Sequence, residues 1–130
     1  KEGIEQVGEL EFRRIERILL RELPTENQIL STGGGTACFY GNMDWMLANG
    51  LVFYLKMSPS DLSQRIIADR EAGIVRHLVD FVSDEDMTEF VAKHLFERQG
   101  FYGQAHHIID GSLPLEAQVK ALMLVLPTDD

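Results

Sequence analysis

The stretch that most limits the fold is residues 51–57, LVFYLKM, where apolar side chains follow one another without alternation. A strand that is buried on both faces of a parallel sheet has such a near-continuous apolar run. Helical patterns lie on both sides of it, and two short segments, 28–32 and 106–110, also have strand character. Strands that alternate with helices predict an α/β fold with a parallel sheet.

Five segments predict helices from their apolar periodicity and their capping residues. They are 8–23, 42–49 with Asn42 as its cap, a segment capped by Ser60, a segment capped by Ser83 that runs to about Arg98, and 113–126. The first carries an apolar stripe, which predicts its core-facing side: Phe12, Ile15, Leu19 and Leu23. Only three strands are visible and the chain opens on a helix, so we expect the first strands of the sheet to be missing.

Composition limits the partners and the compartment. The 130 residues predict one domain, and the formal net charge of −9 argues against a nucleic-acid partner. A few arginines in one cleft can still bind a small phosphorylated ligand on such an acidic chain. No apolar run is long enough to span a bilayer, so we expect no membrane partner. Cys38 is the single cysteine, which suits the reducing cytoplasm, and we expect a cytoplasmic monomer.

Three consecutive glycines, Gly33, Gly34 and Gly35, follow the first strand segment. In open α/β sheets ligands bind beyond the carboxyl ends of the strands. Glycines there allow a ligand to approach the backbone and expose N–H donors. A plain strand-to-helix turn explains the pattern equally well, and no GxxxxGK(S/T) sequence occurs in the chain, so this is not a Walker A loop.

Glu9, Arg13 and Glu16 fall at helical spacing on a face other than that of the apolar stripe. An arginine held between two carboxylates can bind a substrate carboxylate in a bidentate manner. The alternative, a salt-bridged face exposed to solvent, is the more frequent meaning of such a pattern.

Further arginines lie later in the chain. Arg70 and Arg76 bracket the aperiodic segment 72–82, which predicts either a lid that closes on phosphates or a plain surface loop. Arg98 falls at the end of the helix that Ser83 caps and could bind an anion or the last helix carbonyls. The remaining chemical side chains favour structural roles: His106 and His107 point to opposite faces of a strand, and Cys38 has no basic neighbour in sequence. We predict no metal site within these residues.

The ordered set of motifs resembles the shikimate kinase family. GELEFRRIE is similar to its GExxFR segment, STGGGT to its triple-glycine motif, and RHLV stands where the family has an RPLL-like lid sequence. LVFYLKMSPSDLSQRI and ERQGFYGQAHHIID resemble the strand–helix and R-x-x-x-Y segments that follow. The resemblance implies a three-layer αβα parallel sheet of the P-loop kinase, nucleoside-monophosphate-kinase type. Residues 1–130 would form a single domain, the C-terminal three-quarters of that fold.

The resemblance also implies a reaction and its residues. It implies transfer of the γ-phosphate of ATP to the 3-hydroxyl of shikimate, with Mg²⁺, in aromatic amino-acid (chorismate) biosynthesis. Arg13 and Arg98 would hold the substrate carboxylate, Glu16 would support them, and Gly33, Gly34 and Gly35 would contact the substrate through their backbone. Arg76 would reach the phosphates as a catalytic residue, and Arg70 would lie near the nucleotide.

The chain also departs from the family pattern. The first strand, the Walker A loop and the D-x-D segment do not occur in it, and His77 replaces a proline of the lid. ATP and Mg²⁺ would therefore bind mainly through an N-terminal portion outside this sequence, and we expect these residues alone to be inactive. Two alternatives stay open: another small-molecule kinase of the same fold, and a non-catalytic binding protein with this fold.

Overall fold

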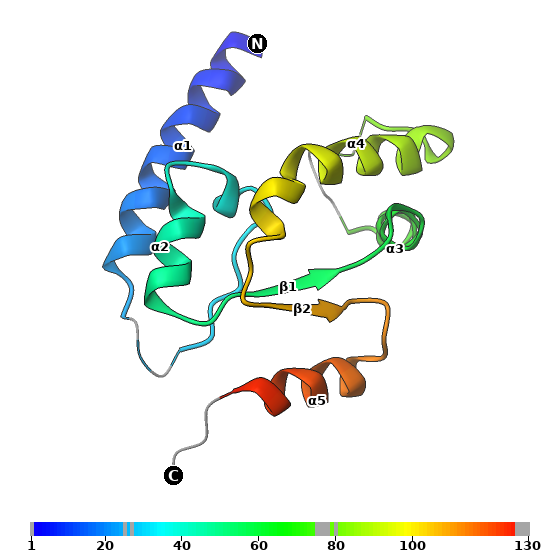
Figure 1. The fold of residues 1–130 in the computed structure, drawn as a ribbon. Helices are drawn as coiled ribbons and strands as arrows, with labels where there is room; N and C mark the ends of the chain where they lie inside the picture. Colours follow the sequence, from blue (N-terminus) through cyan, green and yellow to red (C-terminus); the bar gives the residue numbers. More distant parts are fainter. Residues whose placement is uncertain (1, 25, 27, 75–78, 80, 127–130) are drawn as a thin grey trace. The chain divides into compact units, whose positions relative to one another are not determined.

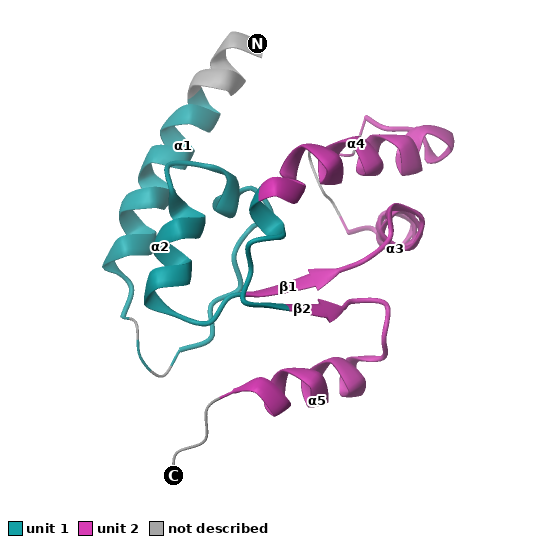
Figure 2. Ribbon diagram, viewed as in Figure 1, with its two compact units in different colours: residues 1–52, 101–107 teal, residues 53–100, 108–130 magenta. Residues whose placement is uncertain are grey.

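The computed structural model describes the backbone of residues 2–24, 26, 28–74, 79 and 81–126, with side chains from Gly8 onward. The elements, in chain order, are α1 (Glu2–Glu22), a 3-10 turn (Thr36–Cys38), α2 (Asn42–Asn49), β1 (Phe53–Lys56), α3 (Pro59–Glu71), α4 (Asp84–Tyr102), β2 (His107–Asp110) and α5 (Leu115–Val125) (Figure 1). They form two compact units. The first unit holds residues 1–52 and 101–107, and the second holds residues 53–100 and 108–130 (Figure 2).

Strands β1 and β2 pair in parallel. The Val52 carbonyl accepts a hydrogen bond from the His107 N–H at 3.2 Å, and the Lys56 carbonyl accepts one from the Gly111 N–H at 2.7 Å. Both partners advance by the same number of residues in the same direction, which is the register of a parallel pair. Helices α3 and α4 lie in the connection between the two strands. The predicted α/β class with a parallel sheet is confirmed.

Two strand predictions are wrong. Residues 28–32, predicted as the first strand, form no strand, and Ile29 in that segment is 94% exposed to solvent. A strand needs a neighbour for its N–H and C=O groups, and in the described part of the chain β1 and β2 bond only each other. The run 51–57 is also not buried on both faces, because Leu55 is exposed. Within the described residues the sheet has two strands, which offer a small surface for other elements to cover.

The helix predictions hold better than the cap predictions. Helix α2 matches the predicted range 42–49, but its N-cap is Gly41, with φ +69°, and Asn42 is buried instead. Helix α3 is capped by Ser58, not by Ser60: the Ser58 hydroxyl accepts from the Asp61 N–H at 3.1 Å. Pro59 then takes the first helical position, where its missing N–H costs nothing.

Helix α4 begins as predicted and ends later. The Ser83 hydroxyl accepts from the Asp86 N–H at 3.3 Å, and acidic residues fill the first turn. Carboxylates are favourable there because the helix dipole is positive at its N-terminus. The helix continues past the predicted end near Arg98 to Tyr102.

Helix α1 turns a different face to its unit than its apolar pattern predicts. The stripe of Phe12, Ile15, Leu19 and Leu23 is exposed, with Phe12 at 55%. The buried side of the helix carries Leu20 and Arg13. The predicted core-facing stripe is therefore wrong, because the first unit packs the 3-10 turn and α2 against the side that holds the charged residues.

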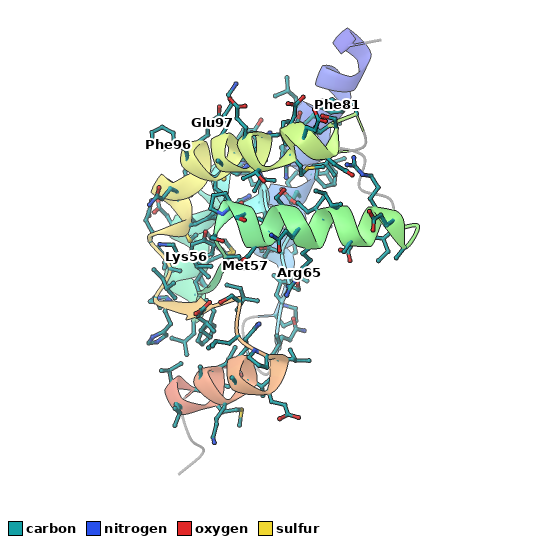
Figure 3. All side chains as sticks on the ribbon, turned by 90° about the vertical axis from the view of Figure 1, so that its right-hand side faces the viewer. Lys56, Met57, Arg65, Phe81, Phe96 and Glu97 are labelled. Atoms are coloured by element: carbon teal, nitrogen blue, oxygen red, sulfur yellow. The ribbon has the colours of Figure 1, made fainter. Side chains whose placement is uncertain are left out.

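The second unit has its own apolar core. Val82, Met87 and Val91 are buried there and contact partly buried side chains of α3, including Leu62 and Ile66. Helices α3 and α4 are also joined by the Thr88 hydroxyl, which donates to the Ser63 hydroxyl at 3.0 Å. Figure 3 shows Phe96 and Glu97 on the side of α4 that faces away from α3.

The predicted lid, 72–82, lies partly outside the described residues. Arg76 and His77 fall in the range 75–78, which the structure does not describe, so the lid assignment stays a prediction. At the start of this segment Gly73 has φ +87°, a left-handed conformation that suits glycine at a helix end. None of the described helices is long and apolar enough to cross a membrane.

Asn42 is the best test of how the first unit is held together. Its Nδ2 donates to the Thr36 carbonyl at 2.9 Å, and its Oδ1 accepts from Arg21 Nη1 at 2.8 Å. We expect Asn42→Ala in the natural full-length protein to lower the free energy of unfolding by about 1–3 kcal/mol, because the carbonyl of the buried Thr36 and the partly buried Arg21 guanidinium each lose a partner. Urea unfolding measures this change as a shift of the midpoint.

Asn49, at the other end of α2, provides the matched control. Its amide donates to the Trp45 carbonyl at 2.8 Å, and this hydrogen bond is exposed to solvent. Asn49→Ala should change the free energy of unfolding by less than about 0.5 kcal/mol. Equal losses in the two variants would contradict the assigned role of Asn42.

Candidate functional site

The guanidinium of Arg13 is the centre of the candidate site. Arg13 is only 9% exposed, although arginine is rarely buried without a partner. Its Cζ lies 4.7 Å from the centre of the Phe39 ring and 5.2 Å from that of Phe12. Aromatic faces attract cations through their negative quadrupole, so the rings hold the charge in place as well as covering it.

Two carboxylates flank this guanidinium, as the helical spacing predicts. Arg13 Nη1 donates to Glu16 Oε1 at 3.0 Å, whereas Nη2 lies 3.8 Å from Glu9 Oε1. The Glu16 side chain is 17% exposed and that of Glu9 is 59% exposed. Arg13 and Glu16 thus form a shielded ion pair, so the alternative of a wholly solvent-exposed face is wrong for these two residues. Glu9 remains a surface carboxylate.

One donor of Arg13 has no partner. Its Nε is buried and makes no hydrogen bond within the described residues. Buried donors are nearly always satisfied in folded proteins, so an unsatisfied one indicates either strain or a group that is yet to bind. A guanidinium offers Nε and Nη2 as a fork that matches the two oxygens of a carboxylate.

Arg14 and Glu11 form another ion pair on α1, and this pair, unlike that of Arg13 and Glu16, is exposed to solvent. Arg14 donates to Glu11 from Nε at 3.1 Å and from Nη2 at 2.5 Å, and both side chains are more than half exposed. The hydrogen bond from the Arg14 side chain lowers the pKa of the Glu11 carboxyl below its ordinary value. Because this pair is solvated, its contribution to stability is small.

The glycine run lies against Arg13. A Cβ atom on Gly35 would be 2.3 Å from Arg13 Nη2 and 2.8 Å from its Cζ, closer than atoms can approach. Gly35 has φ −84° and ψ −14°, which any residue can adopt, so glycine is needed here for space and not for its backbone freedom. A Cβ on Gly33 would meet only the Thr36 hydroxyl, at 3.6 Å. The Gly34 carbonyl accepts a hydrogen bond from the Tyr102 hydroxyl.

A polar network behind the glycines was not predicted from the sequence. Thr36 donates from its hydroxyl to Glu16 Oε2 at 2.8 Å, and its carbonyl accepts from Asn42. Arg21 bonds Asn42 and also donates from Nη2 to the Tyr40 carbonyl at 2.9 Å. Two features of the sequence could have indicated this network. Thr36 directly follows the three glycines, and Arg21 lies two turns after Arg13 on α1.

The other predicted arginines lie in the second unit. Arg98 is half-buried on α4, and its approach to Arg13 stays a prediction. Arg70 Nη1 donates to the carbonyls of Val79 at 3.1 Å and Val82 at 2.7 Å, and Nη2 donates to Asp84 Oδ1 at 2.5 Å. Arg70 therefore fastens the C-terminal end of segment 72–82 to α3. Arg76 lies outside the described residues.

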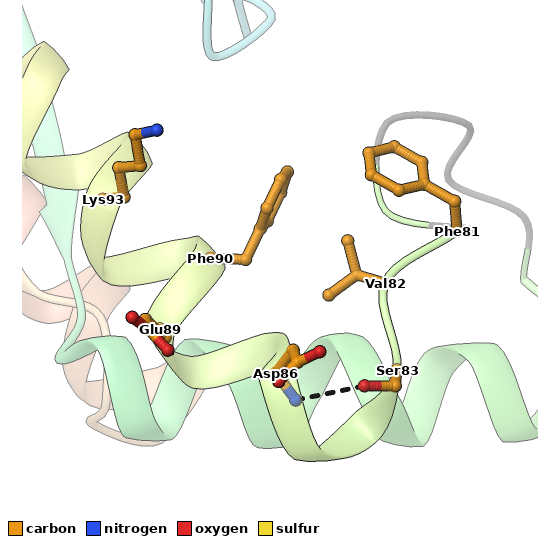
Figure 4. Close-up of a pocket in the computed structure, with 7 residues that line it drawn as sticks. All are labelled: Phe81, Val82, Ser83, Asp86, Glu89, Phe90 and Lys93. Atoms are coloured by element: carbon orange, nitrogen blue, oxygen red, sulfur yellow. Dashed lines mark hydrogen bonds between the residues drawn. The ribbon is translucent and has the colours of Figure 1, made fainter.

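A hollow of about 410 Å³ lies in the second unit, away from Arg13 in sequence. Figure 4 shows its lining, in which Phe90 and Lys93 project from α4 and Phe81 projects from the segment that precedes α4. It is a wide, open depression with no buried charged group in its lining, so we do not assign the chemistry to it. Among the residues that the structure describes, no three His, Cys, Asp or Glu side chains come together in a way that could hold a metal ion.

Comparison with known proteins places this geometry in a family. The sequence profile of shikimate kinase matches residues 1–126. The chain belongs to the shikimate kinase family. Curated proteins named shikimate kinase include one from Azobacteroides pseudotrichonymphae genomovar. CFP2, 43% identical over 100 residues, and one from Flavobacterium johnsoniae, 38% identical over 110 residues. These alignments cover 75% and 82% of this chain, but only 57% and 62% of the relatives, so the chain spans less than two thirds of either relative.

A solved structure has the same fold. The crystal structure of shikimate kinase from Bacteroides thetaiotaomicron superposes with a TM-score of 0.76 at 30% sequence identity. The match covers 96% of this chain and 73% of that chain. The predicted P-loop kinase fold is confirmed. The roles of the individual site residues stay predictions.

Substitution of the glycines tests the geometry around Arg13. In the natural full-length protein, Gly35→Ala should lower the free energy of unfolding by about 1–3 kcal/mol, because the new methyl group displaces a packed guanidinium. Gly33→Ala is the matched control, with ordinary contact distances, and should cost less than about 1 kcal/mol. Thermal unfolding of both variants measures the difference. Similar stabilities would show that the guanidinium is not confined as described.

Proposed function

We propose that the protein that contains this chain is a shikimate kinase, which transfers the γ-phosphate of ATP to the 3-hydroxyl of shikimate to give shikimate 3-phosphate. One observation carries the proposal: a buried arginine of the family's GExxFR-like segment has an Nε donor that finds no partner in the part of the chain that the structure describes. A pre-positioned guanidinium of this kind suits a small substrate that carries a carboxylate. Family membership supports the reaction type.

In this proposal Arg13 binds the shikimate carboxylate through Nε and Nη2. Glu16 holds the opposite side of the guanidinium, and its ion pair prevents the arginine from rotating away. Because Glu9 and Glu16 together outweigh the charge of Arg13, a second cation is required to bind an anion there, and we assign it to Arg98. Gly33, Gly34 and Gly35 border the substrate with their backbone, and Gly35 leaves the space that Arg13 occupies.

On the nucleotide side we assign Arg76 to the phosphates, where its charge would stabilise the transferring phosphoryl group. Arg70 would lie beside the nucleotide. Its Nη atoms are engaged with Val79, Val82 and Asp84, so the planar face of its guanidinium is the part that can stack on a base.

ATP and Mg²⁺ are the co-substrate and cofactor that the proposed reaction requires, and Mg²⁺ is assigned to no residue here. The described residues contain no acidic cluster that fits the ion, and residues 1–130 contain no GxxxxGK(S/T) sequence. Apart from the charge assigned to Arg76, what these residues contribute to catalysis is therefore the binding and orientation of the substrate. We further propose that the protein acts as a monomer and in the cytoplasm, a reducing compartment that suits the single cysteine of these residues.

The role of Arg13 can be tested by kinetics on the natural full-length protein. We expect Arg13→Ala to raise the KM for shikimate about 10–100-fold, because a charge-assisted hydrogen-bond pair is lost. The KM for ATP should change less than about threefold, because Arg13 is assigned to the other substrate. A coupled assay of ADP release with each substrate varied in turn measures both constants.

Arg14→Ala is the matched control, since Arg14 is the neighbouring arginine on α1 but pairs with Glu11 in solvent. It should leave both constants unchanged within about twofold. If Arg13→Ala raises both KM values equally, or neither, Arg13 does not bind the shikimate carboxylate. If the unsubstituted protein binds shikimate and ATP without turnover, the kinase proposal fails and a non-catalytic binding protein is favoured.

A further inference from the structure

The Glu16 carboxylate divides its two oxygens between different partners. Oε1 accepts from Arg13 Nη1 at 3.0 Å, and Oε2 accepts from the Thr36 hydroxyl at 2.8 Å. All three residues belong to the first unit, and both Arg13 and Thr36 are buried. The carboxylate is therefore fixed at both ends, by the helix that carries Arg13 and by the turn that follows the glycines.

This division affects what Arg13 can offer to a ligand. Carboxylates and guanidinium groups prefer a fork in which two oxygens meet two nitrogens. Glu16 makes only one of these two bonds, while Arg13 Nε has no hydrogen-bond partner within the described residues. A Glu16 side chain that lost its hydroxyl partner would have a free oxygen, and Arg13, which it already contacts, has a donor without a partner among the described residues.

We propose that Thr36 is a positioning residue for the anion site: its hydroxyl holds Glu16 in a single-bonded arrangement, so that the remaining donors of Arg13 stay available to the substrate carboxylate. This inference rests on the proposed function for the identity of the substrate. Thr36 itself does not contact the substrate in this account. It prevents the Glu16 carboxylate from competing with the substrate carboxylate for the donors of Arg13.

Thr36 is suited to this role because its backbone is fixed independently of its hydroxyl. Its N–H donates to the Gly33 carbonyl at 3.2 Å, and its carbonyl accepts from the buried amide of Asn42 at 2.9 Å. The Asn42 side chain is in turn held by Arg21. Removal of the hydroxyl should therefore leave the turn in place and change only the partner of Glu16.

The test compares Thr36→Val, which keeps the shape and removes the hydroxyl, with Thr36→Ser, which keeps the hydroxyl. In the natural full-length protein we expect Thr36→Val to raise the KM for shikimate about 3–10-fold, with kcat and the KM for ATP within about twofold of the original. Thr36→Ser should have the same KM for shikimate as the original protein. A purely structural role would move all three constants together and would overturn the inference.

A second readout does not depend on turnover. The Nε–H signal of Arg13 in a ¹H–¹⁵N NMR spectrum of the ligand-free protein should shift in Thr36→Val, as Glu16 moves onto it, and stay in place in Thr36→Ser. An unshifted signal in Thr36→Val, with an unchanged KM, overturns the inference. If the unsubstituted protein does not phosphorylate shikimate, the proposed function fails, and the NMR signal alone decides the role of Thr36.

Thr36→Ala serves as a second variant, with the same criteria, if the valine variant does not fold. Alanine also lacks the hydroxyl, and it avoids placing an additional methyl group beside the Glu16 carboxylate. A shift of the Arg13 Nε signal in Thr36→Ala supports the inference, and an original spectrum overturns it.

Discussion

The burial of one guanidinium governs the first unit of this protein. A buried charge is costly unless it is paired and hydrogen-bonded, and Arg13 meets this condition only in part. Glu16 supplies the opposite charge, Phe39 and Phe12 supply aromatic faces, and Gly35 supplies the space. Each of these residues helps to hold that cation away from water, while its Nε keeps no partner among the residues that the structure describes.

The sequence predicted those parts of the fold that depend on local patterns. The range of α2 follows from periodicity, the cap of α4 at Ser83 from its capping residue, and the parallel pairing of the two later strands from the helices between them. Residues 28–32 failed as a strand because strand formation needs a neighbouring strand, which local sequence does not reveal. The apolar stripe of α1 failed for a similar reason: periodicity identifies two faces of a helix, but the packing partners decide which one is buried.

The candidate site was predicted to the extent that it lies on one helix. The spacing of Glu9, Arg13 and Glu16 placed an arginine between carboxylates, and the structure has this arrangement. Thr36 and Asn42 were missed because each bonds a residue of α1 that is distant in sequence, through a side chain of a type that usually caps a helix or lies on the surface. Only the folded chain shows that the residue after the glycines reaches back to α1.

The central claim is that Arg13 is a prepared carboxylate site, and NMR titration of the natural full-length protein tests it most directly. The account predicts that shikimate shifts the Arg13 Nε–H signal progressively to saturation, as this donor gains its missing partner. The methyl ester of shikimate, which has the same ring without the negative charge, should leave the signal where it is at the same concentrations. A signal that responds equally to both compounds, or to neither, would contradict the account.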